Sequence, residues 1–347
     1  MNLNYKIKKT DKVVIFGHKG LIGSALIKEL KLRKFKKIIS VTKKNLNLLN
    51  NKKVNNFFNK KKPDIVIIAA ARVGGIYANN TYPFNFLYEN LMIQNNIIGA
   101  SIKFECKKLI FLGSSCIYPK KWSKPFSEND LNLSNLEKTN EAYAIAKISG
   151  LKLCETFNRQ YNNNLPKFIT VIPPNLFGPN DNYDIKNSHV LAALIRKFKI
   201  AKIKNHKKIE IWGSGKPKRE FLYSEDAASI IIDLMEISEN KIYRHTKGQF
   251  SHINIGLGKD YKISELVKKL VKISNFKGKI MYNSKYPDGV KRKLLNIKLL
   301  KKISPNSFSK IVTNKKKFDY YLKKEYLNFT EKTIKKFEKN SSYNLPI

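Results

Sequence analysis

Short apolar runs alternate with amphipathic segments along the first half of the chain. The segments with helical periodicity lie at residues 21–32, 54–58, 84–104 and 141–162. The apolar runs flank them, at residues 13–16, 38–41, 64–71, 108–112 and 168–172. Strands that are apolar along their whole length are buried on both faces, and the helices between them cover those faces. The pattern therefore predicts an α/β fold, a doubly wound parallel sheet.

The second half of the chain is less regular. Pro173-Pro174 and Gly178-Pro179 interrupt the pattern after the fifth run. Helical periodicity returns at 190–198, 227–237 and 263–271, and short strand-like runs lie at 209–212 and 252–255. We therefore expect two domains built from separated segments. The larger comprises residues 1–175 plus 221–257, and a smaller α/β domain comprises 176–220 plus 258–347.

A glycine-rich turn follows the first apolar run directly. It reads Gly17-His18-Lys19-Gly20-Leu21-Ile22-Gly23, a Gly-x-x-Gly-x-x-Gly pattern. Between a buried strand and a helix, such glycines allow a tight turn and a close approach of the backbone to a pyrophosphate. The N-terminus of the following helix then offers free N–H groups to the anion. The turn predicts a Rossmann-type dinucleotide site, although a purely structural turn is the plain alternative.

The residues after the second strand favour NADP(H) over NAD. An NAD site usually places an acidic residue about 20 residues beyond the glycines, where it binds the ribose 2′-hydroxyl. Here that region holds Lys43 and Lys44 and no acid. Together with Lys19, these lysines could balance a 2′-phosphate. Adjacent lysines occur easily by chance in so lysine-rich a chain, so the missing acid is the stronger evidence.

Tyr143 and Lys147 form a candidate proton-transfer pair. Their i, i+4 spacing places them on one face of the predicted helix. A nearby ammonium favours the phenolate, so we expect the pKa of Tyr143 to lie below its usual value of about 10. Ser114 or Ser115, at the carboxyl end of the fourth strand, could hydrogen-bond the reacting oxygen. A tyrosine and a lysine at this spacing are often only a helix surface, but here they follow the glycine turn and the strand-end serines in order.

With these motifs the chain resembles the extended short-chain dehydrogenase/reductases, and within them the GDP-L-fucose synthase family, over almost its whole length. The glycine turn and Tyr-x-x-x-Lys are typical of the whole superfamily. The matching segments are 17–25, 69–81, 112–119, 140–147, 175–181, 187–189, 212–215, 219–222 and 287–289. The much more specific ones are the Gly-Ser-Ser-Cys-Ile-Tyr-Pro run at 113–119 and the Asn-Ser-His segment at 187–189. The resemblance implies conversion of GDP-4-keto-6-deoxy-D-mannose to GDP-L-fucose. Such an enzyme epimerises C3 and C5 and then reduces the C4 ketone with NADPH.

The same resemblance assigns roles to individual residues. Ser114 and Tyr143 would polarise the C4 oxygen, with Tyr143 as proton donor and Lys147 holding the nicotinamide ribose. Cys116 and His189 would be base and acid in epimerisation, and ordinary thiol and imidazole pKa values of about 8.5 and 6.5 suit that chemistry. Without the motif, a lone cysteine is more often a small buried hydrophobe and a lone histidine is more often structural.

Two sets of binding residues also follow from the resemblance. The cofactor would contact Gly17, His18, Lys19, Gly20, Leu21, Ile22, Gly23, Lys43, Leu112, Gly113, Ser114, Ser115, Lys147, Pro173, Pro174, Asn175, Leu176 and His189. The GDP-sugar would contact Lys197, Trp212, Arg219 and Asp288. Trp212 could instead belong to the core. Lys19, Lys43 and Lys197 stand where the family often has Arg, which keeps the charge but loses the planar fork.

Composition adds a second class of function to be weighed. The formal net charge is +42, which suggests a polyanion or nucleic-acid partner. However, 61 of the 68 basic residues are Lys, they are scattered, and base readout relies on Arg. We therefore interpret the charge as compositional background and expect no specific nucleic-acid partner. A nucleotide-sugar 4-epimerase or 4,6-dehydratase with bound NAD is the enzymatic alternative.

The remaining composition bears on location and assembly. Cys106, Cys116 and Cys154 form no CxxC pair, so we expect free thiols, a reducing compartment and no metal. Residues 1–12 lack the apolar core of a signal peptide. The longest apolar run falls well short of the roughly 18 residues that a membrane span needs. We expect a cytoplasmic protein without a membrane partner. The family resemblance suggests a homodimer formed through helices 84–104 and 141–162.

Overall fold

A computed structural model describes residues 5–120, 124–131, 135–184, 188–286, 288–331 and 333–334. Asn187 and Pro287, which belong to two of the matched motifs, lie outside the described residues, as do residues 335–347 of the expected second domain.

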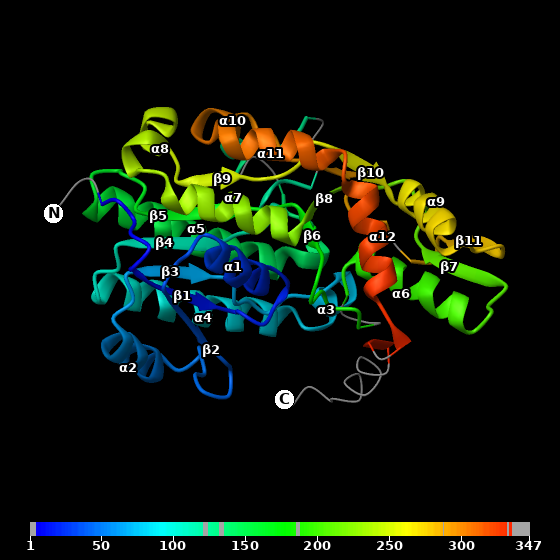
Figure 1. The fold of residues 1–347 in the computed structure, drawn as a ribbon, viewed down its shortest axis with the longest axis horizontal. Coiled ribbons are helices and arrows are strands. Elements are labelled where there is room, and N and C mark those ends of the chain that lie inside the picture. Colours follow the sequence, from blue (N-terminus) through cyan, green and yellow to red (C-terminus); the bar gives the residue numbers. More distant parts are fainter. Residues whose placement is uncertain are drawn as a thin grey trace.

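A six-stranded parallel sheet forms the centre of the larger part of the molecule (Figure 1). Its strand order is β2-β1-β3-β4-β5-β9, and every neighbouring pair is parallel. The strands are β1 (Lys12–Phe16), β2 (Lys37–Val41), β3 (Ile65–Ile68), β4 (Lys108–Leu112), β5 (Phe168–Ile172) and β9 (His252–Asn254). The predicted doubly wound sheet is confirmed. The third strand ends at Ile68 rather than at residue 71, because the chain leaves the sheet where Ala69 and Ala70 pass against the backbone of Gly17.

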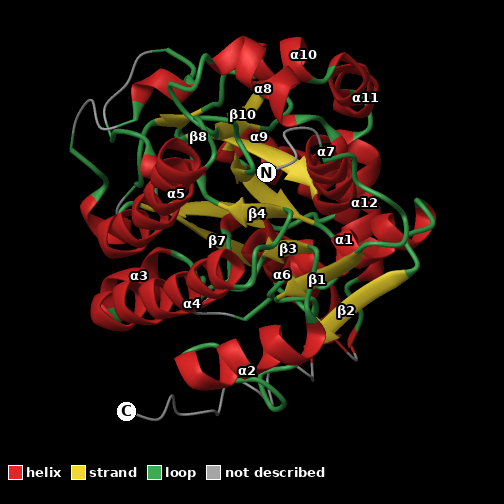
Figure 2. Ribbon diagram, turned by 90° about the vertical axis from the view of Figure 1, so that its left-hand side faces the viewer, coloured by secondary structure: helices red, strands yellow, loops and turns green. Residues whose placement is uncertain are grey.

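Helices cover both faces of this sheet, as Figure 2 shows. One face carries α2 (Asn51–Lys61), α4 (Pro83–Lys103) and α5 (Glu141–Tyr161). The opposite face carries α1 (Leu21–Leu32), α7 (Ser224–Glu236), α8 (Glu239–Thr246), α10 (Lys298–Ile303) and α11 (Pro305–Lys315). Helix α7 begins three residues before the predicted start. The acidic residues of its first turn stabilise this earlier start, because they interact favourably with the positive end of the helix dipole.

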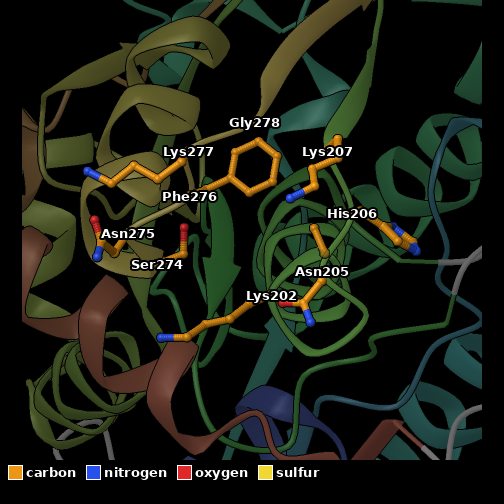
Figure 3. Close-up of a pocket in the computed structure, with 10 residues that line it drawn as sticks. Lys202, Asn205, His206, Lys207, Ser274, Asn275, Phe276, Lys277 and Gly278 are labelled. Carbon is orange, nitrogen blue, oxygen red and sulfur yellow. The ribbon is translucent and has the colours of Figure 1, made fainter.

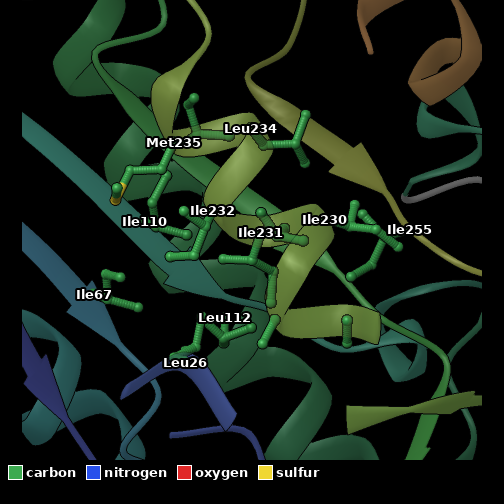
Figure 4. Close-up of a cluster of buried hydrophobic side chains, with 14 of the residues drawn as sticks. Leu26, Ile67, Ile110, Leu112, Ile230, Ile231, Ile232, Leu234, Met235 and Ile255 are labelled. Carbon is green, nitrogen blue, oxygen red and sulfur yellow. The ribbon is translucent and has the colours of Figure 1, made fainter. Parts of the chain in front are cut away.

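The alternating sides of the strands supply two separate cores. Val13, Ile15 and Ile67 face the layer of α1 and α7, whereas Val14 and Val66 face the layer of α2, α4 and α5. Figure 4 shows the first core, where Ile67, Ile110 and Leu112 of the sheet meet Leu26 of α1 and the apolar residues of α7. Burial on both faces explains why the strands are apolar along their whole length.

A second group of elements lies beside the six-stranded sheet, on the right of Figure 1. It contains a small sheet of β6 (Asn175–Phe177), β8 (Lys218–Tyr223), β10 (Asp260–Lys262) and β12 (Arg292–Lys293). A two-stranded sheet joins β7 (Lys208–Trp212) to β11 (Lys279–Asn283). The helices here are α6 (Val190–Ile203), α9 (Ile263–Ser274) and α12 (Phe318–Asn328), which enclose their own aromatic-rich core. Helix α3 (Ile76–Thr81) and the 3-10 turns η1 (Ser115–Ile117), η2 (Glu128–Asp130) and η3 (Lys138–Asn140) complete the described elements.

None of the described helices is both long enough and apolar enough to cross a lipid bilayer.

Candidate active site

The glycine turn forms a cradle between β1 and α1. Gly17 has a φ of +89°, and a Cβ atom there would lie 2.6 Å from the backbone nitrogen of Ala70. A Cβ on Gly23 would collide with the carbonyl of Gly17. Gly20 caps α1 without a side-chain hydrogen bond, so no side chain occupies the N–H groups at the start of this helix. Such a cradle fits the pyrophosphate of a dinucleotide.

Three lysines lie at the same edge of the sheet as this cradle. The glycine turn follows β1, and Lys43 and Lys44 follow the neighbouring parallel strand β2. Their side chains and that of Lys19 are exposed. Residues 42–46 contain no carboxylate that would repel a 2′-phosphate. The described residues therefore fit NADP(H) better than NAD.

The fourth strand carries the next group of residues to the same edge. Leu112 ends β4, and Gly113 donates its N–H to the carbonyl of Val171 on β5. Ser115 donates its N–H to the carbonyl of Pro173, over 3.2 Å, so the segment 113–115 lies against the exit from β5. From there Pro173, Pro174, Asn175 and Leu176 lead into β6.

Ser114, rather than Ser115, faces the catalytic tyrosine candidate. The Ser114 hydroxyl lies near that of Tyr143, where it acts to lower the pKa of the phenol. Ser114 also accepts the N–H of Cys116 over 3.4 Å, at the start of the turn η1. Ser115 is buried beneath them. The structure thus places Ser114, Cys116 and Tyr143 together, on η1 and α5.

Lys147 is held in place below Tyr143. Its Nζ donates to the carbonyl of Leu112 over 2.7 Å and lies 5.7 Å from the centre of the Tyr143 ring. Burial lowers the pKa of Lys147 to about 8. Burial also raises the pKa of Tyr143, so the expectation of a lowered value is wrong for this structure. The cost of removing a phenolate from water outweighs the attraction to an ammonium that is turned towards Leu112.

Cys116 and His189 differ in their surroundings. Burial raises the pKa of the Cys116 thiol, so the expected ordinary value is wrong as well; Lys293, Ser114 and Lys147 act in the opposite direction. His189 directly precedes α6 and is an exposed residue. Surrounding protein lowers the pKa of this imidazole, and His189 forms no hydrogen bond with Cys116.

The expected GDP-sugar residues gather on the second group of elements. Trp212 is 45% exposed, which excludes a role in the core. Its ring stacks on Tyr286 at 4.3 Å, and Nζ of Lys197 lies 4.9 Å from its centre. Lys197 also donates to the carbonyl of Glu210. These side chains offer an exposed planar aromatic surface beside a positive charge.

Arg219 and Asp288 lie nearby but already have partners. Asp288 accepts hydrogen bonds from the N–H and the hydroxyl of Ser214, at 2.9 and 2.5 Å. Arg219 donates to the carbonyls of Lys218 and Val290. Asp288 thus joins its own loop to the loop of Ser214 by hydrogen bonds. Its carboxylate could also accept a hydrogen bond from a substrate hydroxyl.

Sequence reasoning missed two residues of this site. Tyr286 covers Trp212, and Lys293 lies close enough to Cys116 to affect its pKa. Tyr286 could have been found because it stands two residues before Asp288 of a matched motif. Lys293 gave no signal, because it is one lysine among 61.

A cavity of about 300 Å³ lies apart from these residues, between the C-terminal ends of α6 and α9 (Figure 3). Its lining includes Lys202, His206 and Lys277 and none of the expected site residues. The exposed carbonyls at two helix C-termini favour these basic side chains. Among the described residues, no group of three or more His, Cys, Asp or Glu side chains could hold a metal ion.

Comparisons with known proteins agree with this geometry. Residues 13–256 match the model of the NAD dependent epimerase/dehydratase family. The chain is 45% identical to a GDP-L-fucose synthase of Escherichia coli (strain K12) over 286 residues, which is 82% of this chain and 88% of that protein.

Two solved structures are similar throughout. A GDP-6-OMe-4-keto-L-xylo-heptose reductase from C. jejuni has a TM-score of 0.81 at 34% identity, covering 86% of this chain and 94% of the other. A GDP-L-fucose synthetase from Naegleria fowleri bound to NADP has a TM-score of 0.80 at 25% identity, covering 97% and 98%.

Proposed function

Since the chain belongs to the NAD-dependent epimerase/dehydratase family, and within it to the GDP-L-fucose synthases, we infer that its cleft converts GDP-4-keto-6-deoxy-D-mannose to GDP-L-fucose with NADP(H) as cofactor. One observation carries this assignment: a cysteine, Cys116, lies among the proton-transfer groups Ser114, Tyr143 and Lys147. Reduction alone needs no such thiol. A site that also removes a proton from carbon needs an additional base, and this thiol can serve as one.

The reduction uses the tyrosine and its neighbours. NADPH, when bound at the glycine cradle, supplies the hydride that adds to C4. The C4 oxygen then gains a negative charge, and the Tyr143 hydroxyl delivers a proton to it. A tyrosine whose pKa is raised stays protonated until that moment, and Ser114 stabilises the same oxygen by a hydrogen bond. We propose that Lys147 holds the ribose of the cofactor.

The epimerisation uses the cysteine and the histidine. The C4 ketone acidifies the C–H bonds at C3 and C5, because the electron pair released becomes an enolate on the C4 oxygen. We propose that the Cys116 thiolate takes this proton, forming an S–H bond. His189 in its protonated form then returns a proton to the opposite face of the same carbon. Each inversion leaves a proton on sulfur and removes one from the imidazole, so the thiol must lose a proton and the imidazole regain one between the inversions at C3 and C5 and again before the next turnover.

The assignment predicts a specific reaction of the purified protein. With GDP-4-keto-6-deoxy-D-mannose, we expect one NADPH to be oxidised for each GDP-L-fucose formed, measured by absorbance and by chromatography of the product. NADH should serve more poorly, because Lys19 and Lys43 have no 2′-phosphate to bind. Turnover without external NADPH, by a protein purified with NAD, would instead indicate a 4-epimerase or dehydratase.

The two groups of elements support the proposed division of the chain except at α10 and α11, which lie within 258–347 but pack on a face of the large sheet. The sheet of β1 to β5 and β9 has cores of its own, and α6, α9 and α12 enclose a separate one. We propose that residues 1–175 plus 221–257 bind NADP(H), and that 176–220 plus 258–347 bind the GDP-sugar. We also propose a cytoplasmic location, because the three cysteines are free and buried, as is usual in a reducing compartment.

We further propose a homodimer through α4 and α5. These adjacent helices present large exposed apolar side chains, and such a surface marks an interaction site. On α4 they are Phe84, Tyr88 and Ile102, and on α5 they are Ile145, Leu153 and Tyr161. Nothing lies within 4 Å of a Cβ built at Gly99 of α4, so a partner helix can approach there closely.

This surface gives a direct test of assembly. We expect the wild-type chain to sediment at about twice the 40.1 kDa of one copy. Replacing both Tyr88 and Ile145 with glutamate should yield monomers, because buried like charges would face each other across the two-fold axis. Tyr320→Glu, which changes an equally exposed tyrosine on α12, should leave the mass unchanged. A dimer that survives the double substitution would locate the interface elsewhere.

A further inference from the structure

We propose that Lys293 stabilises the thiolate of Cys116 and so makes this cysteine a base at neutral pH. The inference rests on the proposed role of Cys116 in epimerisation. Lys293 acts through Cys116 and is therefore a positioning residue.

Lys293 lies on the short strand β12, which is restrained by strand pairing and by an ion pair. Strand β12 pairs with β8, and Lys293 is in register with Arg219. In a parallel pair, side chains in register lie on the same side of the sheet, so the two cations stand next to each other. Nε of Arg292 forms an ion pair with Asp260 at 2.5 Å, which fixes the strand at its first residue.

The residues after Lys293 are fixed as firmly. Leu294 and Leu295 are buried, and the N–H of Leu295 donates to Oε2 of Glu220 over 2.9 Å. The carbonyl of Leu294 accepts the N–H of Phe126 over 2.8 Å. Leu295 packs in the same apolar cluster as Cys116. The backbone at Lys293 is therefore held beside the turn that carries the thiol.

The ammonium of Lys293 has no partner among the described residues. It forms no hydrogen bond and no ion pair with them, although its side chain is largely buried. The other buried lysine of the site, Lys147, donates to a carbonyl. A buried cation without a partner destabilises the fold. The charge of Lys293 is therefore available to stabilise an anion that forms beside it.

The charged groups around this lysine show which use is available. Arg219 on β8 repels Lys293, and Glu137, which precedes η3, attracts it. Burial lowers the pKa of Lys293, and a thiolate at Cys116 on η1 acts against that shift, just as Lys293 favours the thiolate. Tyr143 and Lys147 face the thiol from α5. The pKa of His189, at the start of α6, is lowered by burial alone, so this residue does not contribute.

The charge of Lys293 meets a need that the site itself creates. Burial raises the pKa of Cys116, so without help the thiol would stay protonated and could not accept a proton from carbon. A neighbouring cation favours the thiolate and lowers the thiol pKa. Lys293 lowers the pKa of the Cys116 thiol, as do Ser114 and Lys147.

The test measures the thiol in the free enzyme, where no substrate phosphate takes part. Alkylation by iodoacetamide as a function of pH reports the pKa of Cys116. Burial raises the pKa of Cys106 and of Cys154 to about 12, so these thiols should not react, and Cys116→Ala supplies the blank. We expect Lys293→Met to move the alkylation midpoint upwards by about one pH unit and to slow alkylation at pH 7 about tenfold.

Three controls separate charge from structure. Lys293→Arg keeps the charge and should restore the wild-type profile. Lys291→Met removes an exposed lysine two residues away and should change nothing. If methionine prevents folding, as judged by circular dichroism and NADPH binding, Lys293→Gln provides the same comparison in a polar side chain of similar reach.

The outcomes distinguish this inference from its alternatives. An unchanged alkylation profile together with a raised KM for the GDP-sugar would overturn it and make Lys293 a substrate contact only. Deuterium uptake from D₂O into C3 and C5 should fall about tenfold in Lys293→Met at pH 7 and recover at higher pH. If the alkylation profile shifts but deuterium uptake does not depend on Cys116, the charge effect stands and the proposed base is wrong.

Discussion

Replacing Tyr143 with phenylalanine is expected to slow reduction of the C4 ketone by about 10²- to 10⁴-fold, the usual contribution of a positioned general acid. The substitution removes one hydroxyl, which lies near Ser114. Ser114 keeps its bond to the N–H of Cys116, so the turn should stay intact. NADPH oxidation under single-turnover conditions measures the loss.

A second reaction in the same protein makes this result specific. Deuterium uptake at C3 and C5 should continue in Tyr143→Phe, because Cys116 and His189 are unchanged. Tyr161→Phe removes a hydroxyl from an exposed tyrosine at the end of the same helix and should reduce normally. If Tyr143→Phe reduced the ketone at the wild-type rate, another group would have to be the proton donor.

Replacing Cys116 with alanine is expected to slow epimerisation much more than reduction, the reverse of the result expected for Tyr143→Phe. Removing the base should lower deuterium uptake at C3 and C5 by at least about 10²-fold. Hydride transfer should fall much less, because Tyr143, Ser114 and Lys147 remain. The product should then be a reduced sugar that has not been epimerised, which mass spectrometry and NMR would identify.

A matched cysteine provides the control. Cys106 is also buried, and its thiol donates to the carbonyl of Pro63, so Cys106→Ser keeps that bond and should leave both steps unchanged. Equal losses of epimerisation and reduction in Cys116→Ala would contradict the assigned role. Such a result would indicate that the thiol supports the geometry of the whole turn instead.

The fold was predictable because its evidence is local. The strands at 13–16 and 108–112 and the helix at 21–32 are marked by continuous or periodic apolar residues, and the structure has them within a residue or two. Strand β8 was not predictable, since its first half, residues 218–220, is charged although Glu220 is buried. Helices α10 to α12 were missed because lysine covers their exposed faces and hides the apolar spacing.

The candidate site divides in the same way. The glycine turn, the strand-end serines and the Tyr143–Lys147 pair are neighbours in sequence or at helical spacing, so the chain itself brings each group together. The meeting of these groups depends on the parallel sheet, which brings the ends of β1, β2, β4 and β5 to one edge. Lys293 and Cys116 are 177 residues apart in the chain. They come near each other because β12, which carries Lys293, pairs with β8.

The sequence by itself therefore determined the class of fold and the cofactor cradle and supplied the candidate reacting side chains, because each of these depends on residue type and short spacing. Only the tertiary structure decided which serine faces Tyr143 and how the pKa values of Tyr143 and Cys116 are shifted. Those properties depend on burial and on charges brought in from distant strands. Desolvation and Coulomb interactions act through space, so a pattern along the chain does not reveal them.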